Sequence, residues 1–187
     1  MAIVLASASP RRRELLELMG ITDFIVCPAS GEPELKGLAP DETVRRIARF
    51  KAEHAAALHL DAAVIAADTL VFADGQALGK PRDREDAGRM LHMLSGKRHA
   101  VYTGVAVIRG ADTLAKAVRT DVYFRSLTDR EIEEYIDTGE PMDKAGAYGA
   151  QGRAAVFIER IDGDFFNVMG LPVCALALML RALGIRP

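Results

Sequence analysis

Short apolar runs alternate with segments of helical spacing along the first third of the chain. The run Ile3–Ala6 predicts a strand that leads into a helix starting near Pro10, and Asp23–Cys27 predicts a second short strand. Apolar positions then recur at helical spacing over residues 42–58, and Asp41 is the expected cap of that helix. Strands that alternate with helices in this way are typical of an α/β fold.

The next apolar strand, Ala62–Thr69, carries Asp68 at its expected carboxyl end. Ligands of open α/β folds gather beyond the carboxyl ends of strands, although an aspartate there also starts turns and caps helices. Asp74 and Gly75 stand between two short apolar runs and predict a hairpin that returns the chain toward Asp68. We therefore expect Lys80, at the end of this hairpin, in the neighbourhood of Asp68.

The rest of the chain is predicted to form capped helices and strands joined by tight turns. Thr128 and Glu131 have the spacing of a capping box, and the sequence Thr103-Gly104 is expected to bend a strand. The expected elements are a helix capped by Asp83 and ending near Leu94, a hairpin of strands at His99–Ile108 and Leu114–Phe124, a helix from Thr128 to Thr138, a strand at Ala154–Ile161 and a helix after Pro172.

The composition is that of a folded chain without membrane segments. Its 187 residues are 50% hydrophobic, which suffices for a sizeable core, and we expect residues 1–187 to form a single domain. No stretch approaches the ~18 to 20 apolar residues of a membrane span. The start lacks the features of an export signal, so we expect a cytoplasmic protein. The net charge of −2 argues against a broad nucleic-acid-binding surface.

The cysteines and histidines offer no zinc site. Cys27 and Cys174 are far apart in apolar surroundings, which predicts two reduced, buried thiols. The four histidines are scattered, and no spacing places two of them on one helical face as metal ligands. We expect the histidines to be structural or exposed.

A candidate phosphate site lies where the first strand meets the first helix. A helix start offers unpaired N–H groups and a positive dipole end, and Ser7 and Ser9 add hydroxyls. Arg11 and Arg12 can fork onto phosphate oxygens. The alternative is an ordinary helix start whose arginines point into water. Lys51 lies on or beside the apolar stripe of the long helix, where a lysine either reaches a ligand or extends to solvent.

A glycine-rich segment spans residues 143–152. Its glycines permit unusual backbone geometry and close approach to a ligand. Tyr148 is placed to contact a base, and Gln151 presents both a donor and an acceptor, the pairing needed to read a pyrimidine edge. The alternative is a flexible connector.

Together with the acids Glu32 and Asp68, these basic and polar groups match a magnesium nucleotide. Carboxylates hold Mg²⁺, while lysine and arginine neutralise the remaining phosphate charge. A carboxylate can also take a proton from an attacking water. The predicted chemistry is hydrolysis by activated water.

An ordered set of motifs runs through the whole chain. It comprises Ser7-Ala8-Ser9-Pro10-Arg11-Arg12, Glu32, Lys51, Ala67-Asp68-Thr69, Lys80-Pro81, Thr103-Gly104-Val105, Gly139-Glu140-Pro141, the segment from Asp143 to Gly152, and Asn167-Val168-Met169-Gly170-Leu171-Pro172. With this set, the sequence resembles the Maf family of nucleoside triphosphate pyrophosphatases, and in particular its dTTP/UTP branch.

The resemblance implies cleavage between the α and β phosphates of dTTP or UTP with a divalent metal cation, Mg²⁺ or Mn²⁺. It makes Asp68 the proton acceptor and, with Glu32, a metal ligand. By the same resemblance the specificity positions are Arg11, Thr69 and Gln151, and the phosphate-binding positions are Ser7, Ser9, Arg12, Lys51 and Lys80.

The fold implied is similar to that of inosine triphosphate pyrophosphatases, with an elongated mixed β-sheet flanked by helices and two lobes around a central cleft. A homodimer is also implied. Two alternatives stay open. One is a 7-methyl-GTP pyrophosphatase of the same family, disfavoured by the sequence from Lys144 to Gly152. The other is a non-catalytic, nucleotide-responsive regulator of cell division, which would not need Asp68.

Overall fold

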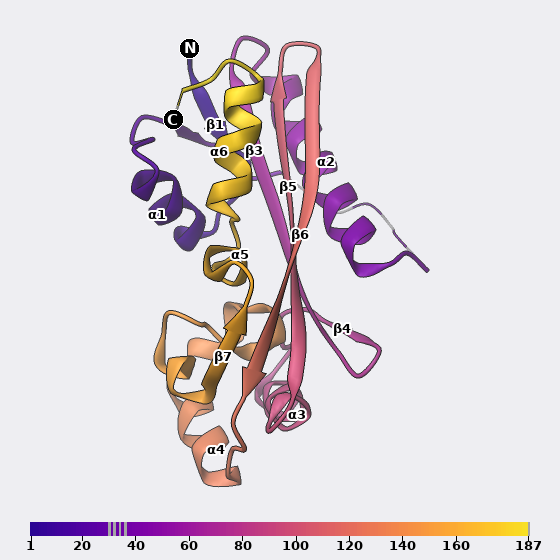
Figure 1. Cartoon of the computed structure of the whole chain (residues 1–187), viewed down its shortest axis with the longest axis vertical. Helices are drawn as coiled ribbons and strands as arrows, with labels where there is room; N and C mark the ends of the chain where they lie inside the picture. Colours follow the sequence, from indigo (N-terminus) through magenta and orange to yellow (C-terminus); the bar gives the residue numbers. More distant parts are fainter. Residues whose placement is uncertain (30, 32, 34, 36, 187) are drawn as a thin grey trace. The chain divides into compact units, whose positions relative to one another are not determined.

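A computed structural model, which describes residues 1–29, 31, 33, 35 and 37–186, gives the chain a mixed α/β fold (Figure 1). The strands are β1 (Ile3–Leu5), β2 (Ile25–Val26), β3 (Ala63–Ala73), β4 (Gln76–Leu78), β5 (Arg98–Arg109), β6 (Asp112–Phe124) and β7 (Ile158–Asp162). Within the described residues they form one seven-stranded sheet in the order β2-β1-β3-β5-β6-β7, with β4 paired to β3. β1 runs parallel to β2 and β3, whereas β4 and β7 pair antiparallel with their neighbours. The expected mixed sheet is confirmed.

The helices lie between these strands in sequence. The α-helices are α1 (Pro10–Leu18), α2 (Pro40–Leu58), α3 (Arg84–Leu94), α4 (Asp129–Asp137), α5 (Phe165–Met169) and α6 (Val173–Ala182), and the 3-10 helices are η1 (Glu140–Asp143), η2 (Ala145–Ala147) and η3 (Arg153–Phe157).

The chain divides into two compact units. Unit 1 comprises Met1–Asp68, Thr103–Val118 and Gly170–Pro187, and unit 2 comprises Thr69–Tyr102 and Arg119–Met169. The long strands β3, β5 and β6 contribute residues to both units. Each unit has a hydrophobic core of its own.

In unit 1, helix α2 covers one face of the sheet, and α1 and α6 lie on the other side (Figure 1). The α2 face is lined by alanines such as Ala48, Ala52 and Ala55, which pack on Val64 and Ala106 of the strands. Side chains this small let the helix approach the sheet closely. The α2 backbone is thereby held near the strands.

In unit 2, helices α3 and α4 pack against the sheet and against each other. The expected caps are confirmed. The Asp83 side chain accepts from the Asp86 N–H at the start of α3, and Thr128 and Glu131 form a reciprocal capping box on α4. The expected hairpin is also confirmed, with Asp74 and Gly75 at positive φ between β3 and β4.

Several local expectations do not match the structure. Asp41 does not cap α2, because the helix begins at Pro40 with Ala39 before it. The last strand begins at Ile158, because the residues just before it wind into the 3-10 helix η3. Helix α5 was not expected. Cys174 is exposed, since it lies on the outer side of α6, and Cys27 is partly buried.

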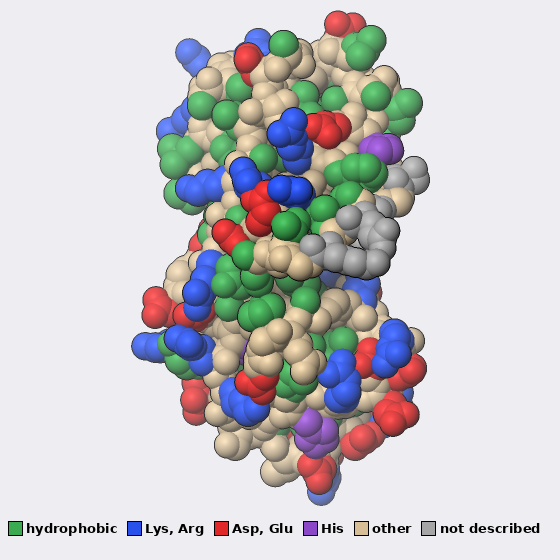
Figure 2. All heavy atoms as spheres, turned by 90° about the vertical axis from the view of Figure 1, so that its right-hand side faces the viewer, with side chains coloured by type: hydrophobic (Ala, Val, Ile, Leu, Met, Phe, Trp, Pro, Cys, Tyr) green, Lys and Arg blue, Asp and Glu red, His purple; other side chains and the backbone are tan. Residues whose placement is uncertain are grey.

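The charged side chains are of both signs on the face that Figure 2 shows, where Lys and Arg are interspersed with Asp and Glu. Neighbouring charges of opposite sign offset each other's field. Among the described residues, no helix combines the length and the apolar character needed to cross a bilayer.

Candidate active site

Asp68 lies inside a strand and not at its end. We expected the strand to stop at Thr69, but β3 continues to Ala73. The last β1–β3 pair is Leu5 with Ile65, so β3 runs on past the point where β1 turns away into α1. The Asp68 side chain is therefore set beyond the carboxyl end of β1, and 17% of it is exposed.

Lys51 pairs with this carboxylate. Its Nζ donates to Asp68 Oδ1 at 2.7 Å, and 16% of the lysine side chain is exposed. The alternative in which Lys51 simply extends into solvent is thus wrong. At this level of burial the ion pair is only partly screened by water. The structure brings together two of the residues predicted from sequence.

Gly104 explains how α2 comes close enough for this pair. A Cβ on Gly104 would lie 2.1 Å from the Val44 carbonyl oxygen and 2.3 Å from its carbonyl carbon. Only a residue without a side chain allows this contact between β5 and the α2 backbone. β5 is continuous through Gly104, so the predicted bend is wrong. The glycine instead allows the α2 backbone to pack closely against the strand. Lys51 lies further along the same helix.

The turn between β1 and α1 is held together by its own predicted residues. Arg12 Nη1 donates to Ser7 Oγ at 2.9 Å, and Arg12 Nε donates to the Gly170 carbonyl oxygen at 2.8 Å. The Ser9 N–H donates to the same Ser7 oxygen at 3.3 Å. Ser9 is the N-cap residue of α1, and within the described chain its side chain forms no capping bond. The Arg12 guanidinium is therefore fixed in the turn instead of pointing into water.

Electrostatics connect this turn to Asp68. Burial lowers the pKa of the Arg12 guanidinium, the Asp68 carboxylate opposes that shift, and the charge of Arg11 adds to it. An arginine remains protonated in proteins despite such a shift. Unit 1 thus connects Ser7, Arg12 and Lys51 to one acid, Asp68, and the charge of Arg11 also acts on Arg12.

Unit 2 contains the remaining predicted residues that the structure describes. Lys80 is exposed and follows Gly79, whose carbonyl oxygen accepts from the Gly146 N–H at 3.0 Å. The loop of Lys80 is thereby joined to the glycine-rich segment. Gln151, in that segment, is also exposed, and Thr69 is partly buried.

Tyr148 does not fit its predicted role. It is 5% exposed, and its hydroxyl lies 2.8 Å from Nε2 of the buried His99. The tyrosine ring packs edge-on against Phe124. A side chain buried in this way anchors the segment to the core and cannot stack on a base. The prediction of a flexible connector is wrong for the same reason.

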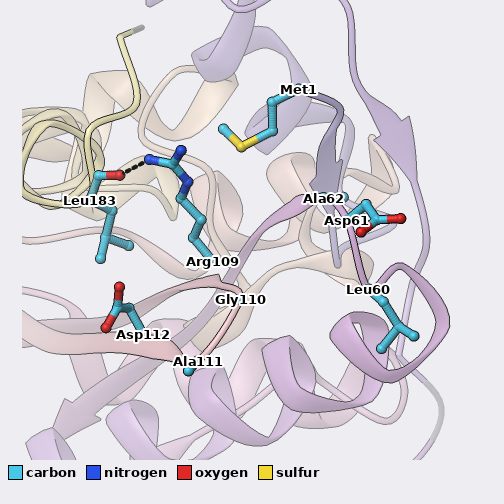
Figure 3. Close-up of a pocket in the computed structure, with 9 residues that line it drawn as sticks. All are labelled: Met1, Leu60, Asp61, Ala62, Arg109, Gly110, Ala111, Asp112 and Leu183. Carbon is cyan, nitrogen blue, oxygen red and sulfur yellow. Dashed lines mark hydrogen bonds between the residues drawn. The ribbon is translucent and has the colours of Figure 1, made fainter.

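No metal cluster is evident in the part of the chain described. Groups of three or more His, Cys, Asp or Glu side chains that could hold an ion are absent there. Glu32, the second predicted metal ligand, lies outside the described residues. A surface cavity of about 500 Å³ in unit 1 (Figure 3) contains none of the predicted site residues, and its Arg109 donates to the Leu183 carbonyl oxygen.

Sequence reasoning missed three residues that organise these regions. Gly170 was noted only as part of a motif, yet its carbonyl oxygen binds Arg12. Glu140 likewise appears in the sequence only as part of a motif, whereas in the structure its carboxylate contacts the glycine-rich segment. His99 is structural, one of the two expectations for the histidines, but the sequence does not identify Tyr148 as its partner. Only the motifs themselves signalled Gly170 and Glu140.

Comparison with known proteins adds the family. A family model described as Maf-like protein matches residues 2–183. The chain belongs to the Maf family. Two similar proteins bear the name dTTP/UTP pyrophosphatase. The one from Agathobacter rectalis is 48% identical over an alignment of 205 positions, which spans 98% of each chain. The one from Pelotomaculum thermopropionicum is 50% identical over 184 residues, 97% of this Maf chain and 96% of that protein.

A solved structure supports the fold. The Ham1 protein of Staphylococcus aureus matches this Maf chain with a TM-score of 0.55 at 16% identity, covering 98% of this chain and 100% of that one. At so low an identity the likeness concerns the fold alone. The expected fold, similar to that of inosine triphosphate pyrophosphatases, is confirmed.

Proposed function

We propose that this Maf protein hydrolyses dTTP and UTP to the nucleoside monophosphate and pyrophosphate. The observation that carries the proposal is the Lys51–Asp68 ion pair, 2.7 Å long, near the Arg12 turn. Together, these residues provide a carboxylate that can activate water and positively charged side chains that can bind phosphate oxygens. The dTTP/UTP pyrophosphatase name of the similar proteins agrees with this chemistry.

In the proposed mechanism, Asp68 accepts a proton from the water that attacks the phosphate. Lys51 holds the carboxylate in position and, with Arg12, offers positive charge where negative charge develops on the phosphate oxygens. Ser7 and Ser9 add polar contacts at the start of α1, whose N–H groups and dipole favour an anion. The Lys51–Asp68 contact, the electrostatic coupling of Arg12 to Asp68 and the Arg12–Ser7 hydrogen bond support these roles.

We assign the divalent cation, Mg²⁺ or Mn²⁺, to Asp68 and Glu32. Mg²⁺ keeps several waters and needs only one or two protein carboxylates when substrate phosphates complete its shell. Asp68 and Glu32 would supply those one or two carboxylates. When bound, such a cation neutralises charge on the phosphates and lowers the pKa of bound water.

Recognition of the base and sugar is assigned to Arg11, Thr69 and Gln151, and further phosphate contact to Lys80. These roles rest on the family resemblance and on the chemistry of each side chain. An amide that donates and accepts at once matches the edge of uracil or thymine. We also propose that residues 1–187 work as one domain, that the enzyme is a homodimer and that it acts in the cytoplasm.

An assay of pyrophosphate release over a panel of nucleotides tests the function. We expect dTTP and UTP to be preferred over 7-methyl-GTP and over the other common nucleotides. The Asp68→Asn variant should lose about 10²- to 10⁴-fold in kcat because it lacks the proton acceptor. Nucleotide binding, measured by calorimetry, should persist.

Three results would contradict the proposal. Preference for 7-methyl-GTP would favour the other branch of the family. Nucleotide binding without any turnover by the parent protein would favour a regulator. Full activity of Asp68→Asn would remove Asp68 from the chemistry.

A further inference from the structure

Gln151 lies in a tight turn that is closed by a hydrogen bond from the Gly152 N–H to the Gly149 carbonyl oxygen, 3.0 Å long. The turn exposes Gln151 and buries Ala150. It belongs to no helix or strand, so the direction of the Gln151 side chain depends on whatever fixes the two ends of the turn.

The carboxylate of Glu140 fixes the far end. Its Oε2 accepts from the Arg153 backbone N–H at 3.0 Å. A Cβ on Gly152 would lie only 2.1 Å from Glu140 Oε1, so the carboxylate sits directly on the backbone of the turn. Gly152 has an ordinary negative φ, and close contact with Glu140 is therefore the reason for a glycine at this position.

Tyr135 fixes the near end. Its hydroxyl accepts from the Gly149 N–H at 3.3 Å and donates to Glu140 Oε1 at 3.0 Å. The ring is 4% exposed and packs edge-on against Phe157, so α4 and the core hold the hydroxyl in place. One carboxylate and one hydroxyl thus bind both ends of the Gln151 turn.

The position of Glu140 is itself fixed. Its backbone N–H donates to Thr138 Oγ1 at 3.1 Å, and its carbonyl oxygen accepts from Lys144 Nζ at 2.8 Å. The Lys144 side chain is 13% exposed and lies against Gly149, where a Cβ would come within 2.6 Å of its Cε. Both Glu140 and its partner Lys144 are therefore held by contacts with their neighbours.

We propose that Glu140 and Tyr135 are positioning residues that set the selectivity of the enzyme for pyrimidine nucleotides by holding Gln151 in a fixed orientation. This proposal rests on the proposed function, in which Gln151 reads the base. Neither residue needs to touch the nucleotide. Without the hydrogen bonds to Glu140 and Tyr135, the turn can adopt several orientations. Nucleotide binding must then also order the turn, and this costs conformational entropy.

The test compares kcat and KM for UTP with those for GTP in the full-length protein. Glu140→Gln keeps the size of the side chain but places an amide nitrogen where an acceptor is needed. Tyr135→Phe removes only the hydroxyl. We expect each variant to raise the KM for UTP about tenfold, in keeping with the loss of one charge-assisted hydrogen bond, and to change kcat for UTP less than twofold.

The same substitutions in a Gln151→Ala background separate positioning from general damage. If Glu140 acts through Gln151, Glu140→Gln should change the KM for UTP less than twofold once Gln151 is absent. Tyr148→Phe is the matched control, because it removes a hydroxyl from the same segment and breaks the one hydrogen bond that this hydroxyl makes in the described part of the chain, with His99. It should lower the thermal midpoint and leave the ratio of UTP to GTP activity unchanged.

The outcomes are distinguishable. An equal loss from Glu140→Gln with and without Gln151 overturns the positioning role, as does an unchanged KM in both Glu140→Gln and Tyr135→Phe. If Gln151→Ala itself leaves the UTP to GTP ratio unchanged, the assignment of Gln151 fails and the inference fails with it. Tyr135→Phe decides the question if Glu140→Gln does not fold.

Discussion

The candidate catalytic residues of unit 1 and the candidate recognition segment of unit 2 are held in place by different means. In unit 1, Lys51 and Asp68 project from a regular helix and a regular strand and meet as an ion pair. In unit 2, the turn of Gln151 has irregular backbone and depends on single hydrogen bonds that backbone N–H groups at its two ends donate to Tyr135 and Glu140. A site on regular elements is sensitive to how closely those elements pack, whereas a site on a turn is sensitive to the loss of one polar group.

The largest effect is expected at the close contact under α2. Gly104→Ala places a methyl group 2.1 Å from the Val44 carbonyl oxygen, and both neighbours are backbone atoms that cannot move away cheaply. We expect a loss of about 3 kcal/mol in the free energy of unfolding, measured with urea. Gly79→Ala is the control, since its Cβ would meet nothing within 4 Å. Equal stability of the two variants would contradict the role of Gly104.

The next effect concerns the ion pair. Lys51→Met keeps the length of the side chain and removes its charge, which leaves the half-buried Asp68 without the ammonium. We expect kcat/KM for UTP to fall about 30-fold, equivalent to about 2 kcal/mol. Lys116→Met changes an exposed lysine on β6 and should leave the rate unaltered. A Lys51→Met enzyme of parental activity would show that unit 1 does not depend on this contact.

Acid should weaken the buried anchor of the recognition segment. Burial lowers the pKa of His99 from 6.5 to about 4, and the charge of Asp121 only partly opposes this. Between these values the unfolded chain binds the proton and the folded chain does not, so this contribution to stability is complete above pH 6.5 and is lost as the pH falls toward 4. At pH 5 the loss relative to pH 7.5 should be about 2 kcal/mol.

Urea unfolding at the two pH values measures this loss. His99→Gln retains a polar partner for Tyr148 and does not titrate, so its stability should depend less on pH in this range. A parent and a variant with the same pH dependence would mean that His99 does not set the acid sensitivity of unit 2.

The smallest effect is expected at the start of α4, the helix that carries Tyr135. Thr128 Oγ1 accepts from the Glu131 N–H at 3.3 Å, and Glu131 Oε2 accepts from the Thr128 N–H at 2.8 Å. Thr128→Ala should cost about 1 kcal/mol of stability by thermal unfolding. Thr113→Ala, at an exposed position of β6, should change stability by less than about 0.5 kcal/mol. Because Tyr135 lies at the other end of α4, the selectivity for UTP should stay at the parental value.

Local features of the fold were predictable because neighbours in sequence decide them. The Asp83 cap, the capping box at Thr128 and the hairpin at Asp74 and Gly75 depend on hydrogen bonds and φ values within a few residues. Predictions failed where the energy came from elsewhere in the chain. β3 runs through Asp68 as one strand that pairs with the distant strands β1 and β5 as well as with β4, and a 3-10 helix replaces the start of the predicted last strand.

The sequence by itself determined the α/β class, the family and the residue types of the candidate site. The spacing of hydrophobic residues and the short motifs can be recognised from residues that are close together in the chain. Only the tertiary structure decided that Lys51 forms an ion pair with Asp68, that Tyr148 is buried in contact with His99 and that Glu140 lies against the turn of Gln151. Each of these contacts joins residues far apart in sequence or on separate elements. Their formation depends on which helix face packs on which strand, and that choice minimises the exposed apolar surface of the whole chain.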